Sequence, residues 1–305
     1  MANRLAGIFI PVATPFAASD ESFDPAALVH NLGQWEQTDV AGYMVLGTNG
    51  EFQSLDDDEA RLVVQAAADH KGDKTLIVGA GRESTRQTIR FIETLAPWYD
   101  RIDYISVLTP NYFAKLIDAR ALLGFYTEIA DACPLPVLAY VAPGYANGVT
   151  IPAATLARLA DHPNIHGIKD TSPAMLVDYL TAVGGREDFE VLAGSLNNIM
   201  TCLALGGRGG VVSAANYLPQ ECARLIELYD SVPTEQAMRY YRLLRRVASS
   251  GGGKQGVASL KAAMNARGYR AGVPRRPLLP ISPASDTELR AALEAGLPVL
   301  HDFGQ

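Results

Sequence analysis

One lysine of the chain stands where its chemistry would differ from that of an ordinary surface amine. Lys169 follows a short apolar run that begins at residue 166, whereas the other five lysines occur in polar or loop-like contexts: Lys71, Lys74, Lys115, Lys254 and Lys261. Burial at the end of a strand lowers the pKa of an amine and leaves it neutral, so that it can attack a carbonyl carbon. The alternative is an ordinary ammonium group paired with Asp170 or Glu51.

A tyrosine ends the preceding apolar run. Tyr140 lies in the run 136–141, and its phenol could carry a proton to or from an intermediate formed on a neighbouring amine. The alternative is a core or rim tyrosine whose hydroxyl only satisfies a hydrogen bond.

The segment Gly-Thr-Asn-Gly-Glu at 47–51 combines small and polar residues at the end of another apolar run. Gly47, Thr48 and Asn49 precede a helical segment, and Ser54 with Asp57 has the spacing of a capping box. Backbone N–H groups before a helix suit a carboxylate or a phosphate. An ordinary strand-to-helix turn would give the same pattern.

Eight short apolar runs alternate with segments of helical periodicity. The runs span 7–12, 42–47, 75–80, 104–109, 136–141, 166–170, 189–194 and 209–214. The helical segments span 25–36, 56–70, 84–96, 118–131, 151–162, 174–183, 197–205 and 219–229. The runs are continuously apolar rather than alternating, which is typical of parallel strands covered on both faces.

This alternation predicts a (β/α)8 barrel over residues 1–231, followed by a helical extension over 232–305. Helices are expected there at 234–248, 257–267 and 287–295, with a loop at 249–256. An open doubly wound sheet is the alternative, but the first run lacks the glycine-rich phosphate fingerprint of that fold. In a barrel the active site lies at the carboxyl ends of the strands. The further strand-end residues are therefore candidates: Thr14, Thr109, Asn111, Tyr112, Gly194, Ser195, Ser213 and Asn216.

Composition restricts the class of protein. The chain of 305 residues is 48% hydrophobic and 19% charged, with a net charge of −7 and no basic block, so a large core is expected and a nucleic-acid or anionic-membrane partner is not. Three cysteines without a C-x-x-C pair fit a reducing cytoplasm. No apolar run is long enough to span a membrane, and Pro11 and Pro15 interrupt the one stretch that resembles a signal peptide.

Metal and cofactor motifs are not expected. His162 and His166 are four residues apart, but Pro163 between them argues against a shared helical face, and no carboxylates cluster with them. The glycine-rich segment at 251–256 lacks the preceding strand and the Ser/Thr of a P-loop.

Taken together, the motifs at 47–51, 109–112, 139–143 and 167–170 resemble the dihydrodipicolinate synthase / N-acetylneuraminate lyase family of class I aldolases, and the likeness covers nearly the whole chain. The resemblance implies a (β/α)8 barrel with Lys169 as the Schiff-base lysine and Tyr140 as the general acid/base. Thr48 would relay protons to Tyr112, which in the family reaches in from a neighbouring subunit of a homo-oligomer, a dimer or a tetramer. Asn49 and the surrounding backbone would hold the keto-acid carboxylate, with Gly47, Gly194, Ser195 and Ser213 as further substrate-binding positions.

Two departures bear on the substrate. Dihydrodipicolinate synthases usually carry an arginine two residues after the proline that matches Pro143, and Tyr145 stands there instead. Asn49 replaces the second threonine of the usual Gly-Thr-Thr-Gly-Glu loop. The segments 81–89, 162–170 and 189–195 look closest to the 4-hydroxy-2-oxoglutarate aldolases of the family.

We therefore expect a cytoplasmic lyase that forms an imine with a small 2-keto acid and releases pyruvate from a 4-hydroxy-2-keto acid, without a metal or cofactor. The alternatives are a dihydrodipicolinate synthase, or a 2-keto-3-deoxy sugar acid aldolase or dehydratase of the same family. A non-catalytic barrel that senses a keto acid is a third possibility, but a sensor has no need of the Tyr140–Thr48 relay.

Overall fold

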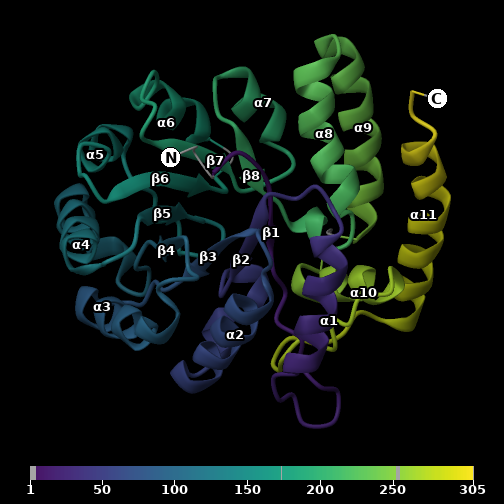
Figure 1. The fold of residues 1–305 in the computed structure, drawn as a ribbon, viewed down its shortest axis with the longest axis horizontal. Helices are drawn as coiled ribbons and strands as arrows, with labels where there is room; N and C mark the ends of the chain where they lie inside the picture. Colours follow the sequence, from purple (N-terminus) through teal and green to yellow (C-terminus); the bar gives the residue numbers. More distant parts are fainter. Residues whose placement is uncertain (1–4, 173, 252–254, 305) are drawn as a thin grey trace. The chain divides into compact units, whose positions relative to one another are not determined.

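Eight parallel strands close into a barrel in the order in which they occur in the sequence (Figure 1). The computed structural model describes residues 5–172, 174–251 and 255–304. The strands are β1 (Gly7–Pro11), β2 (Gly42–Val45), β3 (Thr75–Gly79), β4 (Tyr104–Leu108), β5 (Val137–Val141), β6 (Ile165–Asp170), β7 (Glu190–Ala193) and β8 (Gly209–Val211). Each strand begins within one residue of the start of a predicted apolar run, so the (β/α)8 prediction is confirmed.

A helix follows each strand. These helices are α1 (Pro25–Glu36), α2 (Asp57–His70), α3 (Thr85–Thr94), α4 (Ala119–Ala132), α5 (Ala153–Leu159), α6 (Leu176–Ala182), α7 (Ile199–Ala204) and α8 (Pro219–Ser231). Four of them begin after a capping side chain that accepts a backbone N–H of the first turn: Asp24, Asp56, Ser84 and Asp118.

The capping box predicted from Ser54 and Asp57 is wrong. Asp56 accepts the backbone N–H of Glu59, and the Glu59 carboxylate accepts the backbone N–H of Asp56. Ser54 instead ends a 3₁₀ turn, Phe52–Ser54, that separates the 47–51 loop from α2. Both pairs have the required spacing, and this turn decides between them.

The chain divides into two compact units. Residues Thr75–Val211 form most of one unit, which contains β3 to β8 and α3 to α7. The other unit consists of Gly7–Lys74 with the residues from Val212 onward. In this second unit Trp35 is fully buried, its indole N–H donates to the carbonyl of Asn216, and its ring contacts those of Tyr43 and Tyr269.

Three helices form the C-terminal part of the second unit: α9 (Thr234–Gly251), α10 (Val257–Ala266) and α11 (Pro283–His301). All three were predicted, although α11 is longer at both ends. Its earlier start is explained by the Ser282 cap and by the proline in its first turn. The predicted loop at 249–256 begins later than expected, since α9 continues to Gly251, and residues 252–254 of it lie outside the described residues. A domain boundary at residue 231 stays a prediction.

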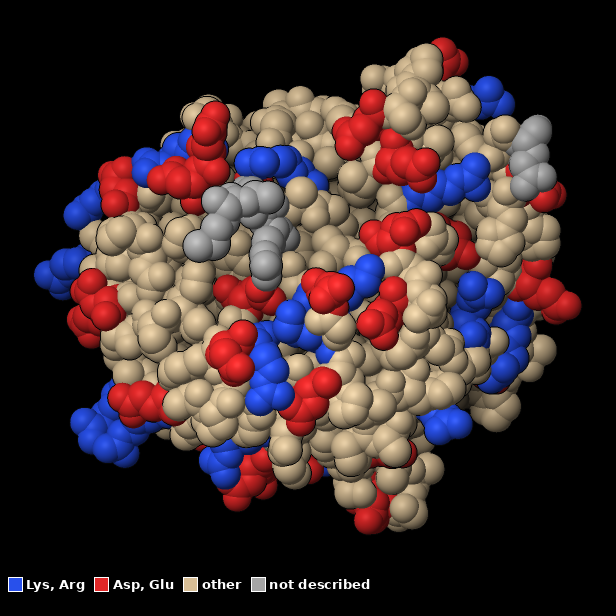
Figure 2. Space-filling model, in the orientation of Figure 1, with Lys and Arg blue, Asp and Glu red and all other residues tan. Residues whose placement is uncertain are grey.

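Charges of both signs are intermixed on the face shown in Figure 2. Within the described residues, no helix is both long enough and apolar enough to cross a membrane.

Candidate active site

Lys169 and Tyr140 lie side by side at the carboxyl ends of neighbouring strands of the first unit. They are register partners in the β5–β6 pair, and the Lys169 Nζ lies 4.1 Å from the centre of the Tyr140 ring. Each residue is only 4% exposed. Desolvation by this burial lowers the pKa of Lys169 to about 7. The amine is therefore substantially neutral near neutral pH, as a nucleophile must be.

The two carboxylates considered as ion-pair partners for Lys169 have close partners of their own. The Asp170 carboxylate accepts hydrogen bonds from the Ser172 hydroxyl at 2.8 Å and from the Ser172 backbone N–H at 2.9 Å. Burial raises the Asp170 pKa to about 6. Glu51, in the second unit, contacts the Lys261 Nζ at 2.6 Å.

The structure contains a second buried lysine that the sequence analysis missed. Lys261 is 1% exposed in α10, so the expectation that it occupies a polar or loop-like context is wrong. Burial lowers its pKa to about 8, although the Glu51 carboxylate opposes this shift. A carboxylate against Nζ favours the ammonium form, so Lys261 is less suited than Lys169 to act as a nucleophile. The apolar sequence around it, Val-Ala-Ser-Leu-Lys-Ala-Ala-Met, was the available signal.

The 47–51 loop is a 3₁₀ turn, Thr48–Gly50, held within the second unit. Leu46 before it and Glu51 after it both have positive φ angles, 55° and 53°, which is unusual for residues other than glycine. The Thr14 hydroxyl donates to the Gly50 carbonyl at 2.7 Å, and the Asn49 amide donates to the Ser213 hydroxyl at 2.7 Å. The structure therefore brings together the strand-end residues predicted on β1, β2 and β8.

The Asn216 side chain forms hydrogen bonds with the backbone of two neighbouring segments. Its amide accepts the Ala13 N–H at 3.1 Å and donates to the carbonyls of Pro11 and Ser213. A strand-end asparagine thus joins the chain after β1 to the turn after β8.

Tyr112 lies on the segment after β4 and is 75% exposed. Its ring packs edge-on against Phe113, with centroids 5.0 Å apart. The Glu83 carboxylate, which follows β3, accepts the backbone N–H groups of Asn111 and Tyr112 at 3.0 and 2.8 Å. Glu83 was not predicted; the polar segment after the third apolar run was the signal for it.

Gly194 and Ser195 follow β7 in the first unit. The Gly194 N–H donates to the Asp170 carbonyl at 2.6 Å, and a Cβ atom at Gly194 would come within 2.8 Å of that oxygen, so a side chain is excluded there. The Ser195 hydroxyl accepts the backbone N–H of Asn197 at 3.2 Å. Gly194 therefore fixes the strand next to Lys169.

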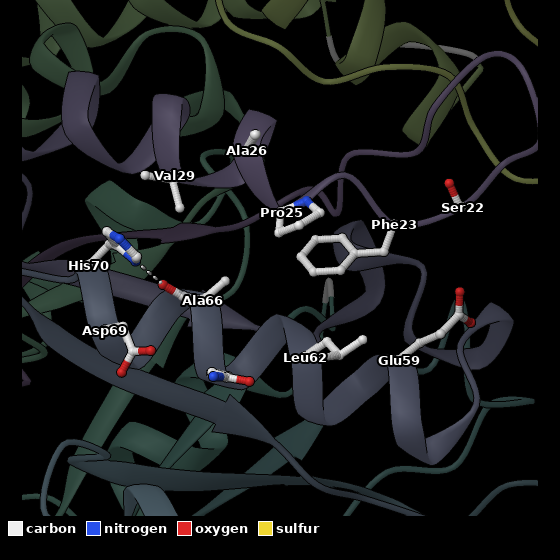
Figure 3. A pocket seen from close by; sticks show the side chains of 11 residues that line it. Ser22, Phe23, Pro25, Ala26, Val29, Glu59, Leu62, Ala66, Asp69 and His70 are labelled. Atoms are coloured by element: carbon white, nitrogen blue, oxygen red, sulfur yellow. Dashed lines mark hydrogen bonds between the residues drawn. The ribbon is translucent and has the colours of Figure 1, made fainter.

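A separate pocket of about 710 Å³ lies between α1 and α2 (Figure 3). Phe23 and Leu62 face each other across it, and Glu59, Asp69 and His70 stand at its edge. It is built from helix faces and the segment leading into α1, and it contains no lysine. We assign no chemistry to it.

Comparison with known proteins decides the family. Residues 4–296 match the model of the "Dihydrodipicolinate synthetase family". The chain belongs to this family. Its members are aldolases and lyases, and the protein is accordingly an enzyme of the lyase class.

The proteins to which this chain is similar are named for different substrates. The chain is 34% identical to a "Probable 4-hydroxy-2-oxoglutarate aldolase, mitochondrial" of Emericella nidulans, over 97% of this chain and 96% of the relative. It is 27% identical to an "L-threo-3-deoxy-hexylosonate aldolase" of Hypocrea jecorina, over 96% of each chain. Among solved structures, the dihydrodipicolinic acid synthase family protein YagE of E. coli K12, in complex with pyruvate, has a TM-score of 0.88 at 26% identity and covers 96% of this chain and 98% of its own.

Proposed function

We propose that this dihydrodipicolinate synthetase family protein is a Schiff-base lyase that releases pyruvate from a 4-hydroxy-2-keto acid. The single observation that carries the proposal is the buried Lys169 amine, 4.1 Å from the Tyr140 ring, at the carboxyl ends of adjacent strands. Burial gives this amine a pKa of about 7. A neutral amine at that position can attack the C2 carbonyl of a keto acid at physiological pH.

The chemistry follows from the imine. Attack by the Lys169 amine on C2 gives a carbinolamine, which loses water to form a protonated imine. The bond between C3 and C4 then breaks, and its electron pair moves into the imine to give the enamine of pyruvate. The C4 hydroxyl loses its proton and becomes a carbonyl, so that the C4 fragment leaves as an aldehyde. Protonation of the enamine at C3 and hydrolysis of the imine release pyruvate and restore the amine.

Tyr140 is proposed to move the protons of these steps, because its phenol belongs to the side chain that contacts Lys169. Thr48 is proposed as the relay hydroxyl to Tyr112. Asn49 and the backbone around it are proposed to hold the keto-acid carboxylate, with Gly47 and Ser213 as neighbouring binding positions. Gly194 and Ser195 are proposed to bind substrate from the first unit.

The substrate we place first is 4-hydroxy-2-oxoglutarate, which the relative of Emericella nidulans is named for. Tyr145 occupies the position of the arginine that a dihydrodipicolinate synthase uses, and a phenol cannot form the two charge-assisted hydrogen bonds of a guanidinium. The distal carboxylate of 4-hydroxy-2-oxoglutarate must then be held by neutral groups, for which Asn147, Ser195 and Asn197 are the candidates. A keto-deoxy sugar acid is the second candidate substrate, supported by the relative of Hypocrea jecorina.

A panel of substrates tests this order. The measurement is kcat/KM for pyruvate release from 4-hydroxy-2-oxoglutarate and from 2-keto-3-deoxy sugar acids, set against condensation of pyruvate with aspartate semialdehyde. The highest value is expected for 4-hydroxy-2-oxoglutarate. A clear preference for aspartate semialdehyde contradicts the substrate proposal.

We further propose that the enzyme is a cytoplasmic homo-oligomer, a dimer or a homotetramer. Large apolar side chains stand exposed on the segments after β4 and β5: Tyr112, Phe113, Leu116 and Tyr145. A second copy covering them would remove this surface from water. Light scattering at assay concentration tests the assembly, and an active monomer contradicts it.

A further inference from the structure

A buried ion pair lies directly behind the 47–51 loop. The Glu51 carboxylate, whose side chain is 2% exposed, contacts the Lys261 Nζ at 2.6 Å, and the Lys261 side chain is 1% exposed. Lys261 Nζ also donates to the Val273 carbonyl at 2.8 Å and lies 4.3 Å from the centre of the Phe16 ring. All these residues belong to the second unit, so the C-terminal part of the chain supplies the cation for a loop that follows β2.

Arg275 completes the arrangement. Its backbone N–H donates to the other Glu51 oxygen at 2.9 Å. Its guanidinium binds both carboxylate oxygens of Glu59 at 2.7 Å and donates to the Ser54 carbonyl at 2.6 Å. The segment from Glu51 to Glu59 is thus held at three points by one arginine, while the Arg275 guanidinium stacks over Phe16 at 4.1 Å.

The approach of the C-terminal segment depends on a glycine. Gly272 forms a β-bridge with Phe16, and the N–H of Val273 donates to the Phe16 carbonyl at 3.1 Å. Gly272 has a φ of +65°, and a Cβ atom there would collide with the Phe16 backbone. Only glycine lets the segment come close enough to place Lys261 and Arg275 against Glu51.

The unfavourable backbone conformation of Glu51 has to be stabilised by contacts of this kind. Glu51 has a φ of 53°, a conformation that costs a residue with a side chain of order 1 kcal/mol or more. The Glu51 N–H donates to the Thr48 carbonyl at 3.0 Å, so its conformation is coupled directly to the turn that carries Thr48 and Asn49. The contacts of the Glu51 carboxylate with Lys261 and Arg275 therefore stabilise the conformation of this turn.

We infer that Lys261, Arg275 and Glu51 are positioning residues that fix the Thr48–Asn49 turn for binding the keto-acid carboxylate. This inference rests on the proposed function. The three residues act through the turn, and none of them is assigned a contact with the substrate. Their loss should weaken the binding of pyruvate through Asn49, and it should also lower kcat because the same turn carries the proposed relay hydroxyl of Thr48.

The test compares four full-length variants. Glu51→Gln and Lys261→Met each leave one buried charge without its partner, the double variant removes both charges, and Lys261→Arg keeps the cation. Glu190→Gln is the matched control, since Glu190 is a buried carboxylate paired with Arg208 at 2.5 Å at the amino end of β7. The dissociation constant for pyruvate is taken from the concentration dependence of borohydride trapping.

We expect the two single-charge variants to weaken pyruvate binding by about 10-fold or more, as misplacement of a binding group does, and to lower kcat because Thr48 is displaced with the turn. The double variant should recover part of the loss because it no longer buries an unpaired charge. Lys261→Arg should bind more tightly than Lys261→Met. Hydrogen exchange should show faster exchange at Gly50 and Glu51 in Glu51→Gln but not in Glu190→Gln.

Two outcomes overturn the inference. One is unchanged pyruvate affinity in folded Glu51→Gln or Lys261→Met, and the other is an equal loss of affinity in Glu190→Gln, which would indicate general destabilisation. Should Glu51→Gln fail to fold, the comparison of Lys261→Arg with Lys261→Met still decides. If the wild-type enzyme traps no pyruvate at all, the proposed function fails; the hydrogen exchange of the loop is read independently of it.

Discussion

The lowered pKa of Lys169 makes the rate of imine formation a direct measure of its burial. With a pKa of about 7, compared with 10.5 for an ordinary lysine, about half of the Lys169 amines are neutral at pH 7. An unperturbed lysine would be neutral in only about 0.03% of molecules at that pH, so burial raises the nucleophilic population by about 1,500-fold. The rate should therefore rise about tenfold per pH unit below pH 7 and level off above it.

Rapid mixing with pyruvate, quenching with borohydride and mass analysis of the peptide carrying Lys169 would measure this rate between pH 5.5 and 10. Tyr140→Phe is the matched control. It keeps the aromatic ring against the amine, and because the shift comes from desolvation, its midpoint should stay near pH 7 even if the absolute rate falls. A rate that continues to rise tenfold per unit beyond pH 9, or an adduct on another lysine, would refute the reasoning.

Four further predictions follow from named contacts. Tyr140→Phe should lower kcat by about 10²–10⁴, the usual scale of general acid–base catalysis, and near-normal turnover would remove Tyr140 from the mechanism. Mixing inactive Lys169→Ala chains with inactive Tyr112→Phe chains should restore partial activity in hybrid oligomers; no recovery, despite hybrid formation shown by native mass spectrometry, would confine Tyr112 to its own chain. Relative to Lys169→Leu, the wild-type free energy of unfolding, measured with denaturant, should rise with pH between about 7 and 10.5. The unfolded chain binds more protons in that window, and the rise is bounded by about 5 kcal/mol, so a flat difference would contradict the lowered pKa. Tyr43→Phe should keep or raise the melting temperature, because the buried Tyr43 hydroxyl has no hydrogen-bond partner among the described residues, whereas Tyr126→Phe should cost about 1 kcal/mol by losing a 3.0 Å bond to Val107; equal losses would contradict this.

The sequence predicts the barrel well because its strands carry a local signal. A parallel strand covered on both faces must be apolar along its whole length, so each of the eight runs can be recognised without knowledge of its neighbours. Lys169 stands out for the same reason, since it is a charged residue at the end of such a run. Its register opposite Tyr140 is a property of the folded sheet, in which the β5–β6 pairing shifts between Val137 and Leu138.

The features that the sequence does not reveal depend on contacts between distant residues. The apolar segment around Lys261 indicates burial, but only the approach of Glu51 shows why a lysine is buried there. Glu83 gains its function from the backbone of Asn111 and Tyr112, after the next strand. The capping box was misplaced by two residues because a short 3₁₀ turn, which has no sequence periodicity of its own, intervenes before α2.

The contacts that fix the 47–51 loop can form only late in translation, because Lys261 and Arg275 are made long after Glu51. Arg275 follows Glu51 by 224 residues, so at typical synthesis rates of 5–20 residues per second the Glu51 carboxylate leaves the ribosome roughly 10 to 45 s before its partner. Throughout that interval the loop lacks the cations that fix it. The proposed keto-acid site of a nascent chain is therefore completed only after Arg275 has been made, and a product that terminates before residue 261 has both the proposed nucleophile Lys169 and an unsupported loop.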